Sequence, residues 1–179
     1  MMHQMHQASQ KIRRRTNCRL CSSGDLALAF SLAPTPPANA FVSAEHLNEP
    51  QEVFPLDVFF CRACTHLQLL DVVDPSVLFE RYVYVSGTSP VFVQHFEKLS
   101  DELAGLTGSL AGKLVVDIGS NDGTLLRAFQ GRHRARTLGV DPARNLAAEA
   151  SASGVETIAD FFSADLAKKI AQKIAINNG

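Results

Sequence analysis

All four cysteines of this chain fall into two C-x-x-C pairs, Cys18 with Cys21 and Cys61 with Cys64. Two such pairs present four thiolates to one Zn²⁺, because the two intervening residues let backbone N–H groups turn back toward the sulfurs. The alternatives are buried thiols or disulfides; a redox pair would need a thioredoxin-like strand and helix beside it. We predict a structural zinc site, since four thiolates leave no open position for water.

The segments around the second pair predict a small zinc-ribbon-like β domain. We expect strands over Val53–Phe60 and Thr65–Val72, with the second C-x-x-C at the tip of their hairpin. The proline-rich segment Leu32–Asn39 predicts a loop. His66 follows Cys64 closely and is an alternative ligand, although four thiolates already complete a tetrahedron. The metal would stabilise a domain of about 50 residues, which is too small to fill a large core.

Composition excludes several classes of protein. The 179 residues are 46% hydrophobic and 20% charged, which suits one medium or two small globular domains. The net charge of -1 gives no general attraction to nucleic acid or to an acidic membrane, and no apolar run reaches the ~18 residues of a membrane span. The polar tail 1–15 lacks the apolar core of a signal peptide. We expect a disordered leader over 1–15, a cytoplasmic protein, and no nucleic-acid or membrane partner; a nucleic-acid arm at Lys11–Arg15 is the alternative.

The second half of the chain alternates short strands and helices. After a helix over Pro90–Leu106, we expect three strands and three helices in alternation: Leu114–Ile118, Gly123–Phe129, Arg136–Val140, Pro142–Ser153, Val155–Ala159 and Ser163–Ile174. Three successive βα units predict a parallel sheet with right-handed crossovers. The residues from Lys173 onward suggest the start of a fourth strand. The predicted class is therefore α/β: a β domain followed by an incomplete doubly wound, Rossmann-like domain.

The junction between the first of these strands and its helix predicts a cofactor site. Asp117 closes the first strand and Asp141 the second, and the carboxyl ends of parallel strands are where such sheets bind ligands. Asp141 is placed to accept both hydroxyls of a ribose. The turn from Gly119 to Gly123 lacks the middle glycine of G-x-G-x-x-G, and Asp117 and Asp122 would repel a pyrophosphate, which disfavours NAD. S-adenosylmethionine, a cationic adenosine without phosphates, fits better; the alternative is a domain whose acidic strand ends only cap helices.

Two tyrosines lie between the halves, in the segment Tyr82–Ser89. Tyr82 and Tyr84 would share one face of an extended segment. By periodicity alone, this pattern predicts amphipathic packing at a domain junction.

Five motifs in this order resemble a known family, the zinc-containing class I S-adenosylmethionine-dependent C-methyltransferases that act on nucleotide-linked keto-deoxysugars and related small molecules. The motifs are Cys18-x-x-Cys21, Pro34-Thr-Pro-Pro-Ala-Asn39, Cys61-Arg-Ala-Cys64-Thr-His-Leu-Gln68, Tyr82-Val-Tyr-Val-Ser-Gly-Thr-Ser89 and Val115-Val-Asp-Ile-Gly-Ser-Asn-Asp-Gly-Thr-Leu125. The likeness covers most of residues 16–167. It implies that Cys18, Cys21, Cys61 and Cys64 bind zinc, that Gly119, Ser120, Asn121 and Asp122, with Asp117 and Gly123 beside them, form the cofactor loop, and that Asp141 binds the ribose. It also implies that Tyr82 and Tyr84 border the active site, against the packing role that periodicity favours.

The resemblance implies a reaction and a domain plan. A base removes a proton α to a ketone of a nucleotide-sugar-like substrate, the enolate attacks the sulfonium methyl, and a tyrosine donates a hydrogen bond to the enolate oxygen. We expect a zinc domain over 16–75, a linker with the tyrosine segment and a helix over 76–110, and a truncated cofactor domain over 111–179. The family's acid/base residues are expected later, so we expect an inactive N-terminal half. The alternative is a zinc-ribbon interaction module with a non-catalytic α/β remnant.

Overall fold

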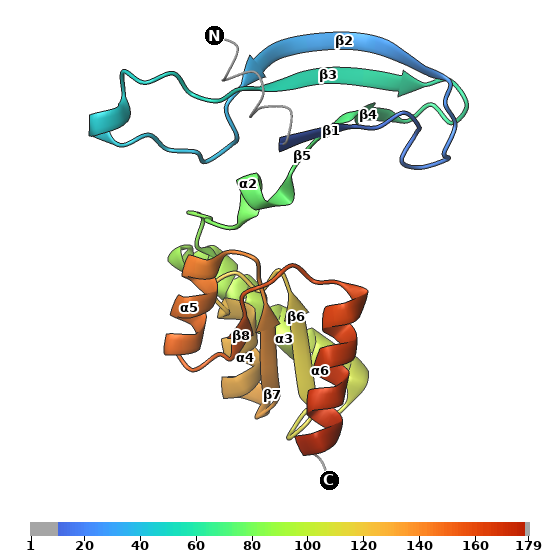
Figure 1. The fold of residues 1–179 in the computed structure, drawn as a ribbon. Helices are drawn as coiled ribbons and strands as arrows, with labels where there is room; N and C mark the ends of the chain where they lie inside the picture. The colour runs from blue at the N-terminus through green and yellow to red at the C-terminus, as the bar shows by residue number, and fades with distance from the viewer. Residues whose placement is uncertain (1–10, 178–179) are drawn as a thin grey trace. The chain divides into compact units, whose positions relative to one another are not determined.

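The computed structural model describes residues 11–177 and divides the chain into two compact units, 1–78 and 79–179 (Figure 1). The short helix α2 (Pro75–Phe79) spans the boundary between them. It begins after Asp74, whose carboxylate accepts hydrogen bonds from the backbone N–H and the hydroxyl of Ser76. Among residues 11–177, no helix is both long and apolar enough to cross a bilayer.

The first unit is built on a three-stranded antiparallel sheet. Its strands are β2 (Leu26–Thr35), β3 (Phe54–Cys61) and β4 (Leu67–Leu69), in the order β2-β3-β4, and a 3-10 turn, η1 (Ala44–His46), lies between β2 and β3. The predicted hairpin with a C-x-x-C at its tip is confirmed, because β3 ends at Cys61 and pairs with β4. The strand expected to leave this tip is divided in two: β5 (Asp71–Val73) follows β4 and pairs with β1 (Ile12–Arg14) in a separate sheet.

Part of the expected leader is ordered. Residues 1–10 lie outside the described part of the chain, but Ile12–Arg14 forms strand β1 against β5. Arg14 donates to the carboxylate of Asp71 at 2.7 Å, and its guanidinium lies 4.9 Å from the ring centroid of Phe59. The basic run that suggested a solvated tail therefore includes a side chain with an ion pair and a cation–π contact, which composition does not reveal.

The loop predicted at the proline-rich segment begins later than expected. Strand β2 continues through Pro34 to Thr35 and contains the whole of Leu32–Thr35. Strand β2 lies at the edge of its sheet, and its register against β3 shifts between Leu32 and Thr35. Proline cannot donate to a ladder, but an edge strand with an irregularity does not require that hydrogen bond. The local rule against proline in a strand is therefore overridden by the position of the strand.

The second unit contains a three-stranded parallel sheet, as the sequence predicts. Its strands are β6 (Leu114–Ile118), β7 (Arg136–Val140) and β8 (Thr157–Ile158), in the order β6-β7-β8. Its α-helices are α3 (Pro90–Thr107), α4 (Thr124–His133), α5 (Arg144–Ala152) and α6 (Ala164–Asn177), and η2 (Ser86–Thr88) is a 3-10 turn. Together with the four-cysteine β unit, this confirms the predicted α/β class, with a partial Rossmann-like sheet in the second unit.

The helices cover both faces of the parallel sheet. Val115 packs against a buried cluster that joins Leu126 of α4 to Ala150 of α5. The adjacent Leu114 packs instead against a cluster that contains Ile170 of α6. Because consecutive strand residues point to opposite faces, α4 and α5 lie on one face and α6 on the other, as in a doubly wound domain (Figure 1). The helix α3 packs against α4.

The fourth strand suggested from Lys173 onward is not formed. Helix α6 instead continues from Ala164 to Asn177. No glycine or proline occurs between Ile170 and Asn177, so nothing in the sequence stops the helix there. The isoleucines at the end of this segment suit a strand by propensity, but propensity alone does not end a helix that is already formed.

The turn between β6 and α4 depends on left-handed backbone. Gly119, Asn121 and Gly123 have φ angles of 80°, 52° and 79°. A Cβ at Gly123 would lie 3.1 Å from side-chain atoms of the buried Val155. Gly123 is therefore constrained both by its own conformation and by the packing around it.

We expect Gly123→Ala to destabilise the second unit by about 1–3 kcal/mol, because alanine strains the left-handed backbone and crowds Val155. The chain has no tryptophan, and its two tyrosines both lie in the second unit, so urea unfolding followed by tyrosine fluorescence reports on this unit. The control is Gly105→Ala on the exposed surface of α3, where a Cβ meets nothing within 4 Å and a gain of up to about 1 kcal/mol is expected. Equal losses in both variants would contradict the argument.

Candidate functional site

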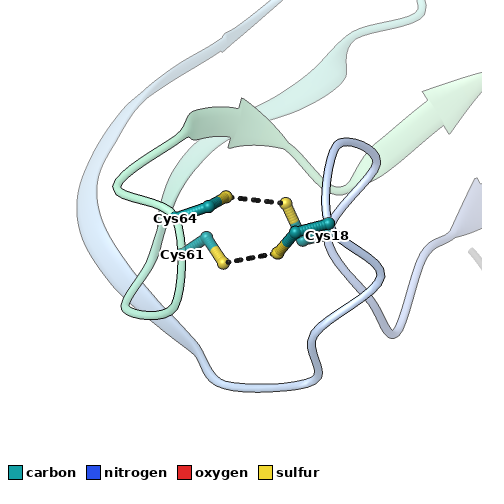
Figure 2. A group of neighbouring side chains, drawn as sticks. Cys18, Cys61 and Cys64 are labelled. Atoms are coloured by element: carbon teal, nitrogen blue, oxygen red, sulfur yellow. Dashed lines mark hydrogen bonds between the residues drawn. The ribbon is translucent and has the colours of Figure 1, made fainter.

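The first candidate site is the group of four thiols, which the fold brings together from the two C-x-x-C pairs. The sulfurs of Cys18 and Cys64 lie 3.7 Å apart and those of Cys21 and Cys61 3.6 Å apart, and all four lie within 4.8 Å of one another (Figure 2). A tetrahedron with Zn–S distances of about 2.3 Å places its sulfurs about 3.8 Å apart, whereas a disulfide requires about 2.05 Å. The four cysteines are free, and their arrangement fits zinc.

The two knuckles share one backbone geometry. The residue after each pair, Ser22 or Thr65, is left-handed, with φ angles of 64° and 61°. The N–H of Ser22 donates to the carbonyl of Cys18 at 3.0 Å, and the N–H of Thr65 donates to that of Cys61 at 2.8 Å. The N–H of Leu20 also points at the Cys18 sulfur, at 3.4 Å. The expectation that the spacing turns backbone N–H groups toward sulfur is confirmed at the first knuckle.

The thiols differ in acidity because of their surroundings. The backbone N–H of Cys21 is the main cause that lowers the pKa of Cys18 to about 6, against the effect of burial. For Cys64, the N–H of His66 lowers the pKa, but the neighbouring Cys21 sulfur, burial and the other two sulfurs together raise it to about 12. Four thiolates therefore cannot form side by side without a compensating charge, which a divalent cation supplies.

A buried amide beside the thiols also fits a bound metal. The side chain of Gln68 is buried, and its Oε1 accepts a hydrogen bond from the N–H of Arg19 at 3.0 Å. Within residues 11–177, its Nε2 has no hydrogen-bond partner of ordinary geometry, although the Gln68 side chain contributes to lowering the pKa of Cys18. A buried N–H without an acceptor is costly, and a metal-bound thiolate at Cys18 is a strong acceptor for it. His66 is not a member of the four-ligand group.

The second candidate site is the carboxyl edge of the parallel sheet, where Asp117 and Asp141 end adjacent strands. Burial and then the charge of Asp141 raise the pKa of the half-buried Asp117. Asp141 is buried, and its two oxygens accept hydrogen bonds from the backbone N–H groups of Asn121 and Ala143, at 2.7 and 2.8 Å. Asp141 therefore holds both the loop after β6 and the start of α5, and each oxygen retains a lone pair for a further donor.

The side chains of the loop from Gly119 to Gly123 differ in how far their hydrogen-bonding groups are already used. The carboxylate of Asp122 is buried and accepts hydrogen bonds from the Thr124 hydroxyl and from Arg127, the latter at 3.0 Å. Ser120 is also buried, and its Oγ has no hydrogen-bond partner in the described protein. Of these two side chains, only Ser120 keeps its hydrogen-bonding capacity free.

The tyrosine segment approaches the same loop through its backbone. It is not a strand, and the Asn121 side chain donates to the carbonyl of Tyr84 at 2.9 Å and accepts from the N–H of Ser86 at 2.9 Å. The Tyr82 ring is half-buried and lies 6.2 Å from the ring of Phe79, whereas Tyr84 is 43% exposed. The structure therefore brings the backbone of Tyr84 to the loop from Gly119 to Gly123.

Sequence reasoning missed two residues of this region. Asn145, in α5, exchanges hydrogen bonds with the backbone N–H and carbonyl of Tyr82, at 3.2 and 2.8 Å. Asp160 follows β8 and adds a third, exposed acid to the same sheet edge. The rule that identified Asp117 and Asp141 could have found Asp160, because it also follows a predicted strand. No sequence signal marks Asn145, since its contact is made across 63 residues.

We expect elemental analysis to give one zinc per chain, and the double variant Cys61→Ser plus Cys64→Ser to lose it, because two ligands are removed. The matched control, His66→Ala, keeps the metal, since His66 is outside the ligand group. Zinc should also dissociate on acidification, because protons compete for the thiolates. Retention of a full zinc equivalent by the double variant would contradict the four-thiolate site.

We expect Asp117→Asn to stabilise the second unit at neutral pH. The folded-state pKa of Asp117 is raised, so ionising it costs stability as the pH rises above the unfolded value of about 3.9, and the variant avoids that cost. At lower pH both side chains are neutral, and the difference should vanish. Urea midpoints by tyrosine fluorescence at several pH values test this, with the exposed Glu149→Gln as control. A stability difference that does not change with pH would contradict the assigned cause.

Comparison with known proteins agrees with the motifs. Residues 18–79 match the family described as "Putative zinc binding domain". The chain is also 40% identical over 156 residues to the C-methyltransferase NovU of Streptomyces niveus; the match covers 87% of this chain and 37% of that protein. The chain thus spans little more than a third of the length of this relative. The resemblance drawn from the motifs is therefore confirmed: residues 18–79 match a zinc-binding family, and most of the chain is similar to a C-methyltransferase.

Proposed function

We propose that the second unit binds S-adenosylmethionine as part of a methyltransferase that methylates a carbon α to a ketone, in a nucleotide-linked deoxysugar or a related small molecule. The main support is the carboxyl edge of the sheet, where the buried Asp141 fixes the loop after β6 and Asp117 lies on the adjacent strand. The relationship to a C-methyltransferase supports the reaction class. The nucleotide-linked deoxysugar substrate comes from the motif resemblance.

In this proposal, the residues of the edge have different roles. Asp141 accepts the ribose hydroxyls on its remaining lone pairs, and Asp117 provides negative charge near the cationic end of the cofactor. Gly119 and Gly123 give the turn its left-handed backbone. The free hydroxyl of Ser120 hydrogen-bonds the ligand or a water beside it, whereas Asp122 holds the loop through Thr124 and Arg127.

The chemistry of the step is divided between the cofactor and the chain. Bound S-adenosylmethionine supplies an electrophilic methyl group on a sulfonium cation. The Tyr82–Tyr84 segment is proposed to border the acceptor, where a tyrosine hydroxyl donates a hydrogen bond to the enolate oxygen as charge develops there. Zinc has a structural role, since four thiolates leave no site for a substrate. We assign the base to no residue of this chain, and we do not expect the chain alone to turn over a keto-deoxysugar nucleotide.

One observation favours a second candidate, a zinc-ribbon module that binds a partner. Leu28, Phe30 and Leu32 of the edge strand β2 are each at least 50% exposed. Exposed apolar residues on an edge strand are a feature of protein interaction surfaces. In that case the α/β unit would have no ligand of its own, which a binding measurement can decide.

We place the protein in the cytoplasm as part of this proposal, because a reducing compartment keeps four thiols available for metal.

We expect isothermal titration with S-adenosylmethionine to show saturable binding, and Asp141→Asn to weaken it about tenfold or more, because the variant loses the charged acceptor for the ribose hydroxyls. The matched control is Glu149→Gln, which removes one negative charge from the exposed face of α5 and should leave the affinity unchanged. Urea unfolding of each variant checks that the second unit is folded.

Three results would count against the proposal. No heat with S-adenosylmethionine while zinc remains bound would favour the interaction module. Preferential binding of NAD would favour a dinucleotide enzyme. Methylation of a keto-deoxysugar nucleotide by this chain alone would refute the expectation that the base lies elsewhere.

A further inference from the structure

Two asparagine side chains hold the tyrosine segment by its backbone. Asn145 bonds to both the N–H and the carbonyl of Tyr82, and Asn121 bonds to the carbonyl of Tyr84 and the N–H of Ser86. In each case a side-chain amide supplies one donor and one acceptor, which is what the backbone of a neighbouring strand would supply. The segment is therefore fixed without becoming a strand.

The two asparagines belong to different parts of the second unit. Asn145 lies on α5, whereas Asn121 is in the middle of the proposed cofactor loop, and its own N–H donates to the Asp141 carboxylate at 2.7 Å. One residue thus links the buried acid at the end of β7 to the backbone between Tyr84 and Ser86. Both ends of the Asn121 amide bond to the segment, which fixes the orientation of this side chain.

The tyrosine segment also lies close to the loop at a third position, Gly87. A Cβ at Gly87 would lie 2.4 Å from Oδ2 of Asp122 and 2.7 Å from the Thr124 hydroxyl. Both atoms are held in place, because Asp122 and Thr124 bond to each other and to Arg127. The segment therefore lies directly on the turn that begins α4.

We propose that Asn121 is a positioning residue that joins the cofactor loop to the tyrosine segment, so that ligand binding at Asp141 orders the segment facing the acceptor. This inference rests on the proposed function. It assigns Asn121 a different role from the cofactor contact implied by the motif resemblance. The coupling is reciprocal, so a loosened segment also weakens the ligand at the loop.

The first test needs no ligand. In the full chain with zinc bound, amide exchange followed by NMR should quicken about tenfold or more at Ser86 in Asn121→Gly. Glycine is chosen because it keeps the left-handed φ of 52° without strain. Asn121→Asp keeps the acceptor for the Ser86 N–H and should leave this amide much closer to its original rate. The matched variant Asn145→Ala should quicken Tyr82 and leave Ser86 unchanged. An unchanged Ser86 amide in Asn121→Gly would overturn the proposal.

The second test uses S-adenosylhomocysteine as the probe. Saturation of the original chain should slow exchange at Ser86, and Asn121→Gly should lose this slowing at saturation while binding the probe no more than about tenfold more weakly. Slowing that persists in Asn121→Gly would overturn the coupling. If the original chain gives no binding heat, the proposed function and the coupling both fail, and the ligand-free test still decides whether Asn121 holds the segment. If Asn121→Gly does not fold, Asn121→Asp decides through the probe: it lacks the donor to the Tyr84 carbonyl, so it should lose part of the slowing at Ser86, and full slowing would overturn the proposal.

Discussion

The second unit depends on one buried carboxylate, that of Asp141. A buried acid is tolerable only when its oxygens are hydrogen-bonded, and here each oxygen accepts a backbone N–H, one from the loop after β6 and one at the start of α5. The same carboxylate raises the pKa of Asp117 on the adjacent strand, after burial. The geometry of the loop, the position of the helix and the electrostatics of the edge thus share one origin. A group that serves as a structural hub can also serve as a ligand site, because its remaining lone pairs are held in fixed directions.

The sequence predicts the parts of this fold in which local pattern and tertiary packing agree. The strands Leu114–Ile118 and Arg136–Val140 are found with the predicted bounds, because each is a short segment with β-branched residues that a turn signal follows, Gly119 or Asp141-Pro142. The four-cysteine group was also predictable, because the C-x-x-C spacing of each pair is typical of a zinc knuckle. The two wrong predictions have a common cause, which is that a local sequence rule does not include the surrounding structure. Pro34 is tolerated in a strand because that strand lies at the edge of its sheet. Helix α6 continues through Asn177 because the helix is already formed before that point.

The candidate site shows the same division at finer scale. Asp117 and Asp141 were found because they lie at the carboxyl ends of strands, a rule that needs only the order of residues. The roles of Asn121 and Asn145 could not be predicted from the sequence, because each side chain bonds to backbone atoms dozens of residues away. Every residue type has the same backbone atoms, so the sequence does not identify such a partner. Asp122 illustrates the reverse case: its place in the motif suggests a ligand contact, but its carboxylate is already bonded to Thr124 and Arg127.

In the first unit, a long segment of the chain separates the two cysteine pairs that form the metal site. The two knuckles repeat the same hydrogen bonds, and the segment between them contains β2, η1 and most of β3. The entropy of closing a flexible loop grows slowly with its length, by about 0.6 kcal/mol for each doubling. Insertions near Ala44–His46, in the connection between β2 and β3, would therefore cost the metal site little. This connection could therefore lengthen, and gain new contacts, without any change to the zinc centre.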